Sequence, residues 1–167
     1  MKRIAYVLAV CLLLFSFAGC KQNNSDIQKP AEFYYCRIEA EFHHENGVIS
    51  SEIRDISGLS DDLTELMNYY LKGPQSDSLA SPFLNGSSIE NATVANGKAT
   101  INLGRQFSLL KDYDLSLACI CIAKTIFSVT DAETVILKAN SAFHDGSLYK
   151  AFSKTSFMDS DNANQFG

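Results

Sequence analysis

Histidine is the side chain best suited to act as a general base near neutral pH, because its ordinary pKa is about 6.5. The chain has three: His43 and His44, which precede Glu45 at the end of a predicted strand, and His144. Ser-His-Asp catalysis would have to use one of them. Adjacent residues on a strand point to opposite faces, so His43 and His44 make a poor chelate. We interpret them as solvated turn residues.

Pairs of aspartates could act as general acid and base, or bind a cation, if they met in one cleft. The pairs in this chain are Asp61 with Asp62, Asp112 with Asp114, and Asp159 with Asp161. The first two pairs precede predicted helices, where carboxylates stabilise the positive end of the helix dipole. The third lacks the glycine and the terminal glutamate of a calcium loop. We therefore expect no catalytic residue, no metal site and no cofactor.

Two other kinds of site are disfavoured by composition and spacing. The tyrosine pairs Tyr34–Tyr35 and Tyr69–Tyr70 could stack on sugar rings, but their positions in a predicted strand and helix favour the core. No glycine-rich phosphate loop follows a predicted strand. The 167-residue chain has 14 basic and 19 acidic side chains, a net charge of −5, which argues against nucleic-acid binding.

The N-terminal residues predict export and a membrane anchor. Met1-Lys2-Arg3 is a basic start, and the apolar run Ile4–Ala18 is too short to span a bilayer comfortably but is typical of a signal peptide. The segment Phe17-Ala18-Gly19-Cys20 resembles the lipobox of bacterial lipoproteins, with Phe17 where an aliphatic residue is usual. The resemblance implies that Cys20 is the lipidation site and carries acyl chains such as palmitate. An ordinary signal peptide with a chance cysteine, or a signal anchor, is the alternative.

The chain is expected to divide into four parts. These are the signal peptide at residues 1–19, the lipidated cysteine and polar tether at 20–31, an α+β domain at 32–143, and a polar C-terminal extension at 144–167. Removal of the signal peptide takes away Lys2 and Arg3, so the acidity belongs to the exported part. The predicted location is the bacterial cell membrane, facing outside the cytoplasm.

Three cysteines remain besides Cys20 and the signal-peptide Cys11. Cys119 and Cys121 are two residues apart in a predicted helix, so they point in different directions. Either one could bridge to Cys36 and leave the other free. Three buried free thiols, packed as small apolar side chains, are the alternative.

Hydrophobic spacing and turn residues predict an α+β fold with one small core. The expected elements are helices over 60–72 and 113–129 and strands over 33–42, 48–56, 87–95, 98–103 and 134–139. Ser60 is the candidate cap of the first helix, Lys72-Gly73-Pro74 is its stop, and Asn96-Gly97 is a hairpin turn. We expect a mixed or antiparallel sheet of about four strands with two helices on one face, and the apolar second helix packed between other elements.

The order of these elements resembles the GerMN domain, named after a sporulation and spore-germination lipoprotein. The matching residues are Leu63-Thr64-Glu65-Leu66, Tyr70–Pro74, Ser81-Pro82-Phe83-Leu84, Ile89–Leu103, Ala118, Ile122, Thr125, Ile126, Val129 and Val135-Ile136-Leu137. The resemblance covers about residues 33–140, and Gly104 and Ala139-Asn140 depart from the family's pattern. It implies a fold similar to the ring-building motifs of sporulation channel proteins.

The combined expectation is a non-catalytic, membrane-anchored binding or assembly module outside the cytoplasm. Through the resemblance it is linked to sporulation, germination or the cell envelope. Expected partners are the membrane, through the lipid anchor, and proteins, peptidoglycan or further copies of the chain. One alternative is a cell-wall-acting lipoprotein enzyme or accessory subunit, which needs two acidic side chains that converge in a cleft with raised pKa values. Another is a ligand-binding or adhesion lipoprotein, which needs a deep apolar pocket.

Overall fold

Two β-sheets enclose the helices of this protein. A computed structural model of the chain describes residues 28–38 and 47–155. The three-stranded sheet consists of β2 (Ile49–Asp55), β1 (Pro30–Arg37) and β3 (Leu79–Ala80), in that order. The four-stranded sheet consists of β4 (Ile89–Ala95), β5 (Lys98–Leu103), β6 (Thr134–Ala139) and β7 (Tyr149–Ser153), in that order.

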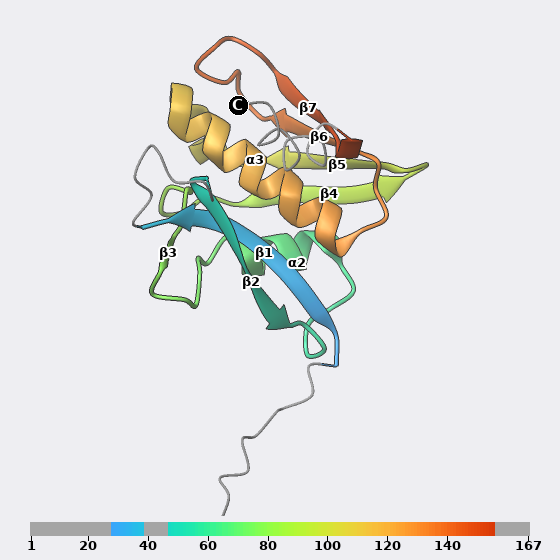
Figure 1. Ribbon diagram of the computed structural model, residues 1–167. Coiled ribbons are helices and arrows are strands. Elements are labelled where there is room, and N and C mark those ends of the chain that lie inside the picture. The colour runs from blue at the N-terminus through green and yellow to red at the C-terminus, as the bar shows by residue number, and fades with distance from the viewer. Residues whose placement is uncertain (1–27, 39–46, 156–167) are drawn as a thin grey trace, which may run out of the picture.

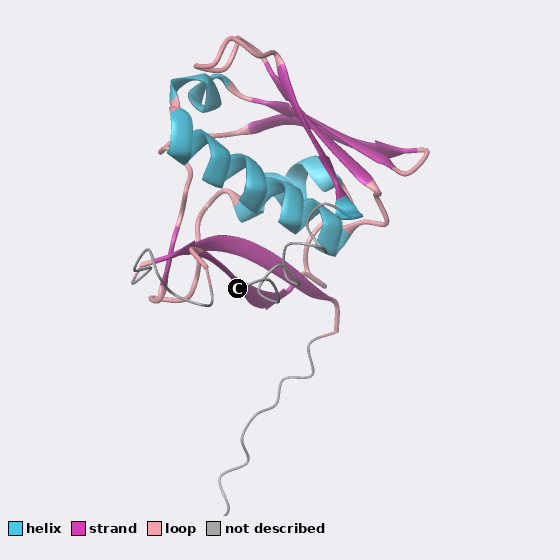
Figure 2. Cartoon of the chain, turned by 45° about the horizontal axis from the view of Figure 1, so that its top comes forward, coloured by secondary structure: helices cyan, strands magenta, loops and turns pink. Residues whose placement is uncertain are grey.

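The helices α2 (Leu63–Tyr70) and α3 (Asp112–Val129) lie between the two sheets (Figures 1 and 2). A short 3-10 helix, η2 (Arg105–Leu109), precedes α3. The predicted α+β class is therefore confirmed, with a mixed sheet of four strands and both helices on one of its faces. The separate three-stranded sheet was not predicted. The prediction placed all strands in one sheet, whereas β1 and β2 lie on the far side of the helices.

The four-stranded sheet is built from one hairpin and one crossover. Asn96 and Gly97 both have positive φ angles, +52° and +70°, and join β4 to β5 as the sequence predicted. The helix α3 then carries the chain over the sheet, so that β6 pairs in parallel with β5, with Val135 opposite Ala99. The strand β7 pairs antiparallel with β6 inside the region expected to be a polar extension.

The first helix is capped by Asp62 and not by Ser60. The Asp62 carboxylate accepts hydrogen bonds from the backbone N–H groups of Thr64 (2.7 Å) and Glu65 (3.4 Å). Ser60 lies outside the helix, and its hydroxyl accepts from the N–H of Asp62 (3.1 Å). Both side chains satisfy N–H groups that would otherwise lack partners. The observed cap is two residues after the predicted one.

The second helix is the centre of the core. Eight of its residues are buried, among them Ala118, Ile122 and Ile126, which are fully so. Its two sides pack on β1 and on β6, which explains why its sequence is apolar almost all round. Among the described residues, no helix is both long and apolar enough to cross a membrane.

A row of aromatic rings links the three-stranded sheet to η2. Phe33 of β1 stacks on Tyr70 of α2 at 5.4 Å between ring centroids, and Tyr70 meets Phe83 edge-on at 5.2 Å. Phe83 in turn packs on the buried Phe107 at 6.1 Å. Such ring pairs stabilise a fold by about 0.5–1.5 kcal/mol each beyond simple burial. The row therefore fixes β1, α2 and η2 relative to one another.

Candidate functional site

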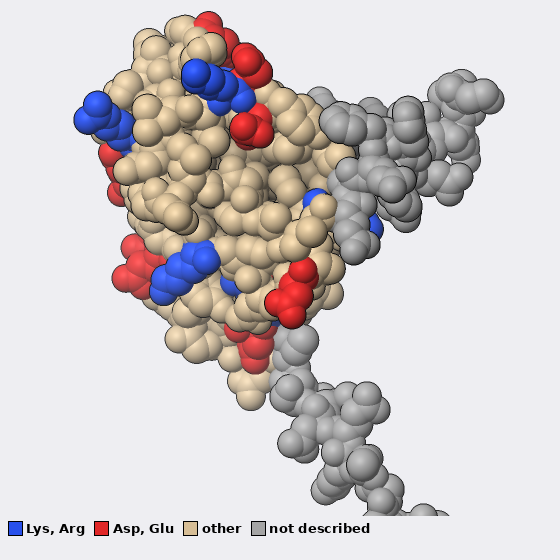
Figure 3. Space-filling view, turned by 90° about the vertical axis from the view of Figure 1, so that its left-hand side faces the viewer, with Lys and Arg blue, Asp and Glu red and all other residues tan. Residues whose placement is uncertain are grey.

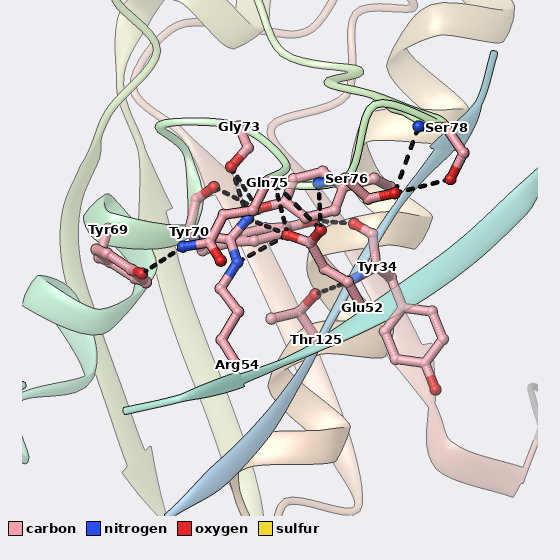
Figure 4. A network of polar contacts seen from close by, with 11 residues as sticks. Tyr34, Glu52, Arg54, Tyr69, Tyr70, Gly73, Gln75, Ser76, Ser78 and Thr125 are labelled. Atoms are coloured by element: carbon pink, nitrogen blue, oxygen red, sulfur yellow. Dashed lines mark hydrogen bonds and ion pairs between the residues drawn. The ribbon is translucent and has the colours of Figure 1, made fainter. Parts of the chain in front are cut away.

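The edge of β1 that faces the helices is closed by three hydroxyl groups. The Tyr34 N–H donates to Thr125 Oγ1 (3.0 Å), and the hydroxyl of Tyr70 donates to the carbonyl oxygen of Tyr34 (2.6 Å; Figure 4). One turn beyond Thr125, Ser128 Oγ donates to the carbonyl oxygen of Glu32 (2.6 Å). These bonds satisfy backbone groups that another strand would otherwise take, so α3 replaces a strand beside β1.

A buried arginine holds together the polar centre of the three-stranded sheet. The Arg54 side chain is only 4% exposed and forms an ion pair with Glu52, whose Oε1 accepts from Nε at 2.7 Å. A terminal nitrogen of the same guanidinium donates to the Tyr35 hydroxyl (3.0 Å) and to the Gly73 carbonyl oxygen (2.7 Å). Its central carbon lies 5.4 Å from the centroid of the Tyr69 ring. Figure 4 draws the hydrogen bonds and the ion pair. Together with the ring contact they give the cation a partner in nearly every direction.

The partner carboxylate fixes the loop that follows α2. Glu52 accepts hydrogen bonds from the backbone N–H groups of Gln75 (2.9 Å) and Ser76 (2.9 Å). Burial raises the pKa of Glu52, but these bonds and Arg54 lower it by more, so the pKa lies below its ordinary value. The pKa of Arg54 is raised in turn, because Glu52 outweighs the effect of burial. The pair is therefore charged at neutral pH and acts as a clamp on the chain.

The tyrosine in this network is unsuited to proton transfer. Burial raises the pKa of Tyr35 far above its ordinary value, and its hydroxyl already donates to the carbonyl oxygens of Tyr70 (2.8 Å) and Gly73 (3.2 Å). A group held in its protonated form this firmly is a poor general base. Tyr35 and Tyr70 are fully buried, as the core interpretation predicted, whereas the other member of each pair, Tyr34 and Tyr69, is half-buried.

A cleft of about 350 Å³ lies between α3 and β7. Its lining residues are Asp112, Leu115, Ser116, Cys119, Ile120, Asp145, Lys150 and Phe152. Two of the lining residues, Asp112 and Asp145, are acidic. Asp145 forms an ion pair with Lys150. Hydrogen bonds from Lys150 and Ser147 hold the pKa of Asp145 well below its ordinary value. The other carboxylate, Asp112, has an oxygen 3.9 Å from Nδ1 of His144. The cleft therefore lacks a carboxyl pair poised for acid–base chemistry.

The remaining predicted candidates do not form a site. Asp61, Asp62 and Asp114 are exposed at helix starts, and hydrogen bonds from Lys29 and from the Thr64 N–H lower the pKa values of Asp61 and Asp62 respectively. His43, His44, Asp159, Asp161 and Cys20 lie outside the described residues. Within the described part of the chain, no three His, Cys, Asp or Glu side chains come together as a metal site would require.

The cysteines point in different directions, as their spacing predicted. The Cys121 thiol lies beside that of Cys36 of β1, and each shifts the pKa of the other, whereas Cys119 lines the cleft near Lys150. All three are free thiols in this structure. Of the two partners that the sequence left open for Cys36, only Cys121 contacts it.

Four of the described strands lie at the edges of their sheets. The strands β2, β3, β4 and β7 each pair with another strand on one side only. Side chains of α2 bond to the outer edge of β4, where Thr64 accepts from the Ala92 N–H (3.0 Å) and Asn68 bonds to both backbone groups of Ile89. The three longer edge strands each carry an exposed apolar residue: Ile53 on β2 (63% exposed), Val94 on β4 (45%) and Tyr149 on β7 (61%). Figure 3 shows one face on which basic and acidic residues are scattered around a largely uncharged area. No continuous basic patch is visible on that face.

Sequence reasoning missed the Arg54–Glu52 pair, although a signal was present. Both residues lie in the segment Glu52-Ile53-Arg54, and residues two apart on a strand share a face. A basic and an acidic residue on one face, beside a predicted core of tyrosines, indicate an ion pair. Gln75 and Ser76 carried no such signal, because they contribute only backbone N–H groups.

Comparisons with known proteins identify the fold. No protein-family model and no curated protein matches this chain. The structure is similar to the tandem GerMN domains of the sporulation protein GerM from Bacillus subtilis, with a TM-score of 0.52 and 21% identity over 74% of this chain and 45% of that one. This chain thus spans less than half of that protein. A candidate lipoprotein from Clostridium perfringens matches with a TM-score of 0.44 and 17% identity, over 77% of this chain and 90% of that one. The chain has a GerMN-like fold, as its sequence resemblance implied.

Proposed function

We propose that this protein is a bacterial lipoprotein whose GerMN-like domain is a non-catalytic binding or assembly module outside the cytoplasm. The fold carries the proposal, because the similar solved structure is that of a sporulation protein. The chain would accordingly act in sporulation, germination or the cell envelope. Fold alone does not determine function, so the supporting features of this chain are given next.

The N-terminal sequence supports the anchored location. Cys20 follows a signal-like segment and precedes a polar stretch, and β1 begins at Pro30. A stretch of about ten residues can lift a folded domain off a membrane surface. A diacylglycerol thioether plus an amide-linked chain at Cys20 would supply the two or more acyl chains that stable anchoring requires.

The electrostatics of the described carboxylates support a non-catalytic role. An enzyme acting on cell-wall glycans would need an acid whose pKa is raised. The carboxyl groups with displaced pKa values are Glu52, Asp55, Asp61, Asp62 and Asp145, and all are shifted downward. They act as charged partners of N–H groups and lysine or arginine side chains.

The open strand edges support the assembly role. An edge strand presents unpaired N–H and C=O groups, which a strand of another chain can pair with. The β2 strand is seven residues long and carries the exposed aliphatic side chain of Ile53, and β7 carries the exposed ring of Tyr149. The outer edge of β4 is less available, because Thr64 and Asn68 of α2 already bond to its backbone at Ala92 and Ile89. Lateral contacts through such edges could join copies of this chain or a different envelope protein.

The test compares the full-length protein with a Cys20→Ala variant in a bacterial host. Metabolic labelling with an alkyne analogue of palmitate, followed by membrane fractionation, should label the wild-type protein and place it in the membrane pellet. The variant should be unlabelled and leave the pellet. Light scattering of the detergent-extracted protein, alone and with purified peptidoglycan, then measures assembly. A wild-type protein that is unlabelled and stays out of the membrane pellet would contradict lipid anchoring at Cys20. A protein that stays monomeric and does not bind peptidoglycan would contradict the proposed role as a binding or assembly module.

A second candidate function, binding of a small ligand, rests on the α3–β7 cleft. Its volume of about 350 Å³ is near the lower end for ligand pockets, about 300–1,000 Å³. Its mixed lining of Ile120, Phe152 and the Asp145–Lys150 pair suits a small amphipathic molecule. An Ile120→Trp variant, which fills the cleft, should abolish any ligand-dependent rise in melting temperature and leave assembly unchanged.

A further inference from the structure

The contacts between β1 and α3 follow a regular register. Two residues of a strand advance by about 6.7 Å and one helical turn by about 5.4 Å, so every second strand residue can meet successive turns of a helix. Glu32 is bonded to Ser128, and two residues on, Tyr34 is bonded to Thr125. The next step along β1 reaches Cys36, and the next turn back along α3 reaches Cys121.

The register places the thiols of this third step beside each other. Cys36 and Cys121 each shift the pKa of the other, and both are free thiols. The two preceding steps hold β1 and α3 in place through bonds to the β1 backbone, so the two sulfur atoms are brought together by the fold itself. Cys121 is buried and Cys36 is half-buried, which leaves Cys36 accessible to a reagent in solution.

We propose that Cys36 and Cys121 are a disulfide-forming pair that links β1 to α3 when the protein is in an oxidising compartment. The oxidising location rests on the proposed function, because disulfides persist outside the cytoplasm and are rare within it. A disulfide needs an S–S distance of about 2.05 Å and a Cβ–Cβ distance of about 3.5–4.5 Å. The bonds of Glu32 to Ser128 and of Tyr34 to Thr125 set Cys36 beside Cys121, so rotation of the two side chains can bring the sulfur atoms to that geometry.

Bond formation proceeds by exchange with a disulfide-bearing oxidant, such as a thiol–disulfide oxidoreductase or oxidised glutathione. The Cys36 thiolate attacks one sulfur of the oxidant, forms a mixed disulfide and displaces the first thiol of the oxidant. Cys121 then gives up its proton, attacks the Cys36 sulfur and displaces the second thiol. Two electrons pass from the protein to the oxidant, which is reduced to two thiols.

The electrostatics of the pair suit this order of steps. The neighbouring Cys121 thiol lowers the pKa of Cys36, while the Cys36 thiol and burial raise the pKa of Cys121. The accessible sulfur is therefore the one that ionises more readily. Burial raises the pKa of Cys119 to about 12 and it faces the cleft, so it is an internal control and not a participant.

The experiment uses the full-length protein extracted in detergent from bacteria that export it. In the first portion, cells are quenched with acid and their free thiols are alkylated, so that the thiol state in the cell is preserved. In the second portion, the extracted protein is fully reduced and then equilibrated with oxidised glutathione. Peptide mass spectrometry maps the disulfides in both portions. Both portions should yield a peptide pair joining Cys36 to Cys121, with Cys119 alkylated. The bridge should persist in Cys119→Ser and be absent from Cys121→Ser, and reduction should lower the melting temperature by roughly 5–15 °C.

Comparison of the glutathione-treated protein with the protein taken from cells shows whether the disulfide inference or the proposed function has failed. If glutathione fails to form the bridge in the folded protein, or joins Cys36 to Cys119 instead, the inference is overturned. If glutathione forms the Cys36–Cys121 bridge but cells contain only free thiols, the pairing stands and the extracytoplasmic location is contradicted. Mapping in the wild type does not depend on whether the serine variants fold.

Discussion

The backbone N–H of Tyr34 donates a 3.0 Å hydrogen bond to the hydroxyl of Thr125, a fully buried side chain 91 residues further along the chain. This bond explains why the protein has two sheets. A strand added to β1 at this point would need the same N–H, and α3 already occupies that side. The sheet therefore stops at β1, apart from the two-residue β3 near Cys36 and Arg37.

Replacement of Thr125 by valine should destabilise the fold although the shape of the side chain is kept. The change removes the acceptor of the part-buried Tyr34 N–H, and the loss of this bond should cost about 1–3 kcal/mol. Urea unfolding of Thr125→Val and of the exposed control Thr93→Val measures the difference. Equal midpoints for the two variants would show that this bond does not hold β1 on α3.

Removal of the buried cation should be more damaging. The Arg54→Met variant leaves the Glu52 carboxylate without its ion-pair partner and should lower the free energy of unfolding by about 3–5 kcal/mol. The exposed Arg105→Met is the matched control and should change it by less than about 0.5 kcal/mol. The double variant Glu52→Gln/Arg54→Met should recover part of the loss, because no uncompensated charge remains. Additive losses would mean that the two residues act independently.

The same pair should make stability depend on acid pH. The pKa of Glu52 is lower in the folded protein than its ordinary value of 4.5, so its contribution is full above that value. The contribution is lost as the pH falls through the lower, folded-state pKa. Urea midpoints measured between pH 2 and pH 7 should therefore fall less steeply on acidification in Glu52→Gln than in the wild type. Parallel curves for the two proteins would assign the acid sensitivity to other carboxyl groups.

Gly104 is required by close packing and not by its backbone angle. Its φ is −67°, but a Cβ there would lie 2.4 Å from the Ser88 hydroxyl oxygen and 3.0 Å from the Ser88 carbonyl oxygen. Its N–H also donates to that carbonyl oxygen at 2.8 Å, which ties the end of β5 to the start of β4. Gly104→Ala should therefore cost about 1–3 kcal/mol. Gly58→Ala, where a Cβ meets nothing within 4 Å, should be neutral or slightly stabilising in the same thermal-unfolding series.

Elements with local signals could be predicted from the sequence. The α3 helix and the β6 strand were predicted within one residue of their ends, and the Asn96-Gly97 turn set the register of β4 and β5. The β7 strand was missed because its five residues carry no clear alternation, and it forms only by pairing with β6. The two-sheet arrangement depends on Thr125, Ser128 and Tyr70 reaching β1, and such contacts between distant segments leave no trace in local patterns.

The candidate surfaces could be predicted less well than the fold. The sequence left both Cys119 and Cys121 open as partners of Cys36. The observed orientation of α3 relative to β1 was needed to favour Cys121. The cleft beside β7 involves the Asp145–Lys150 pair, whose two residues lie in a stretch that reads as a polar extension. Its position follows from the β6–β7 pairing and could not be read from spacing.

The most direct test of the central claim is cross-linking of intact cells with a membrane-impermeant, amine-reactive reagent. Exposed lysines such as Lys98 and Lys138 provide reactive groups on the domain surface. If the domain is anchored outside the cytoplasm and assembles with itself or another envelope protein, the wild type should shift to discrete higher-mass species, and Cys20→Ala should lose them. A wild-type protein that the reagent does not modify in intact cells, or that is modified but stays at monomer mass, would contradict the account.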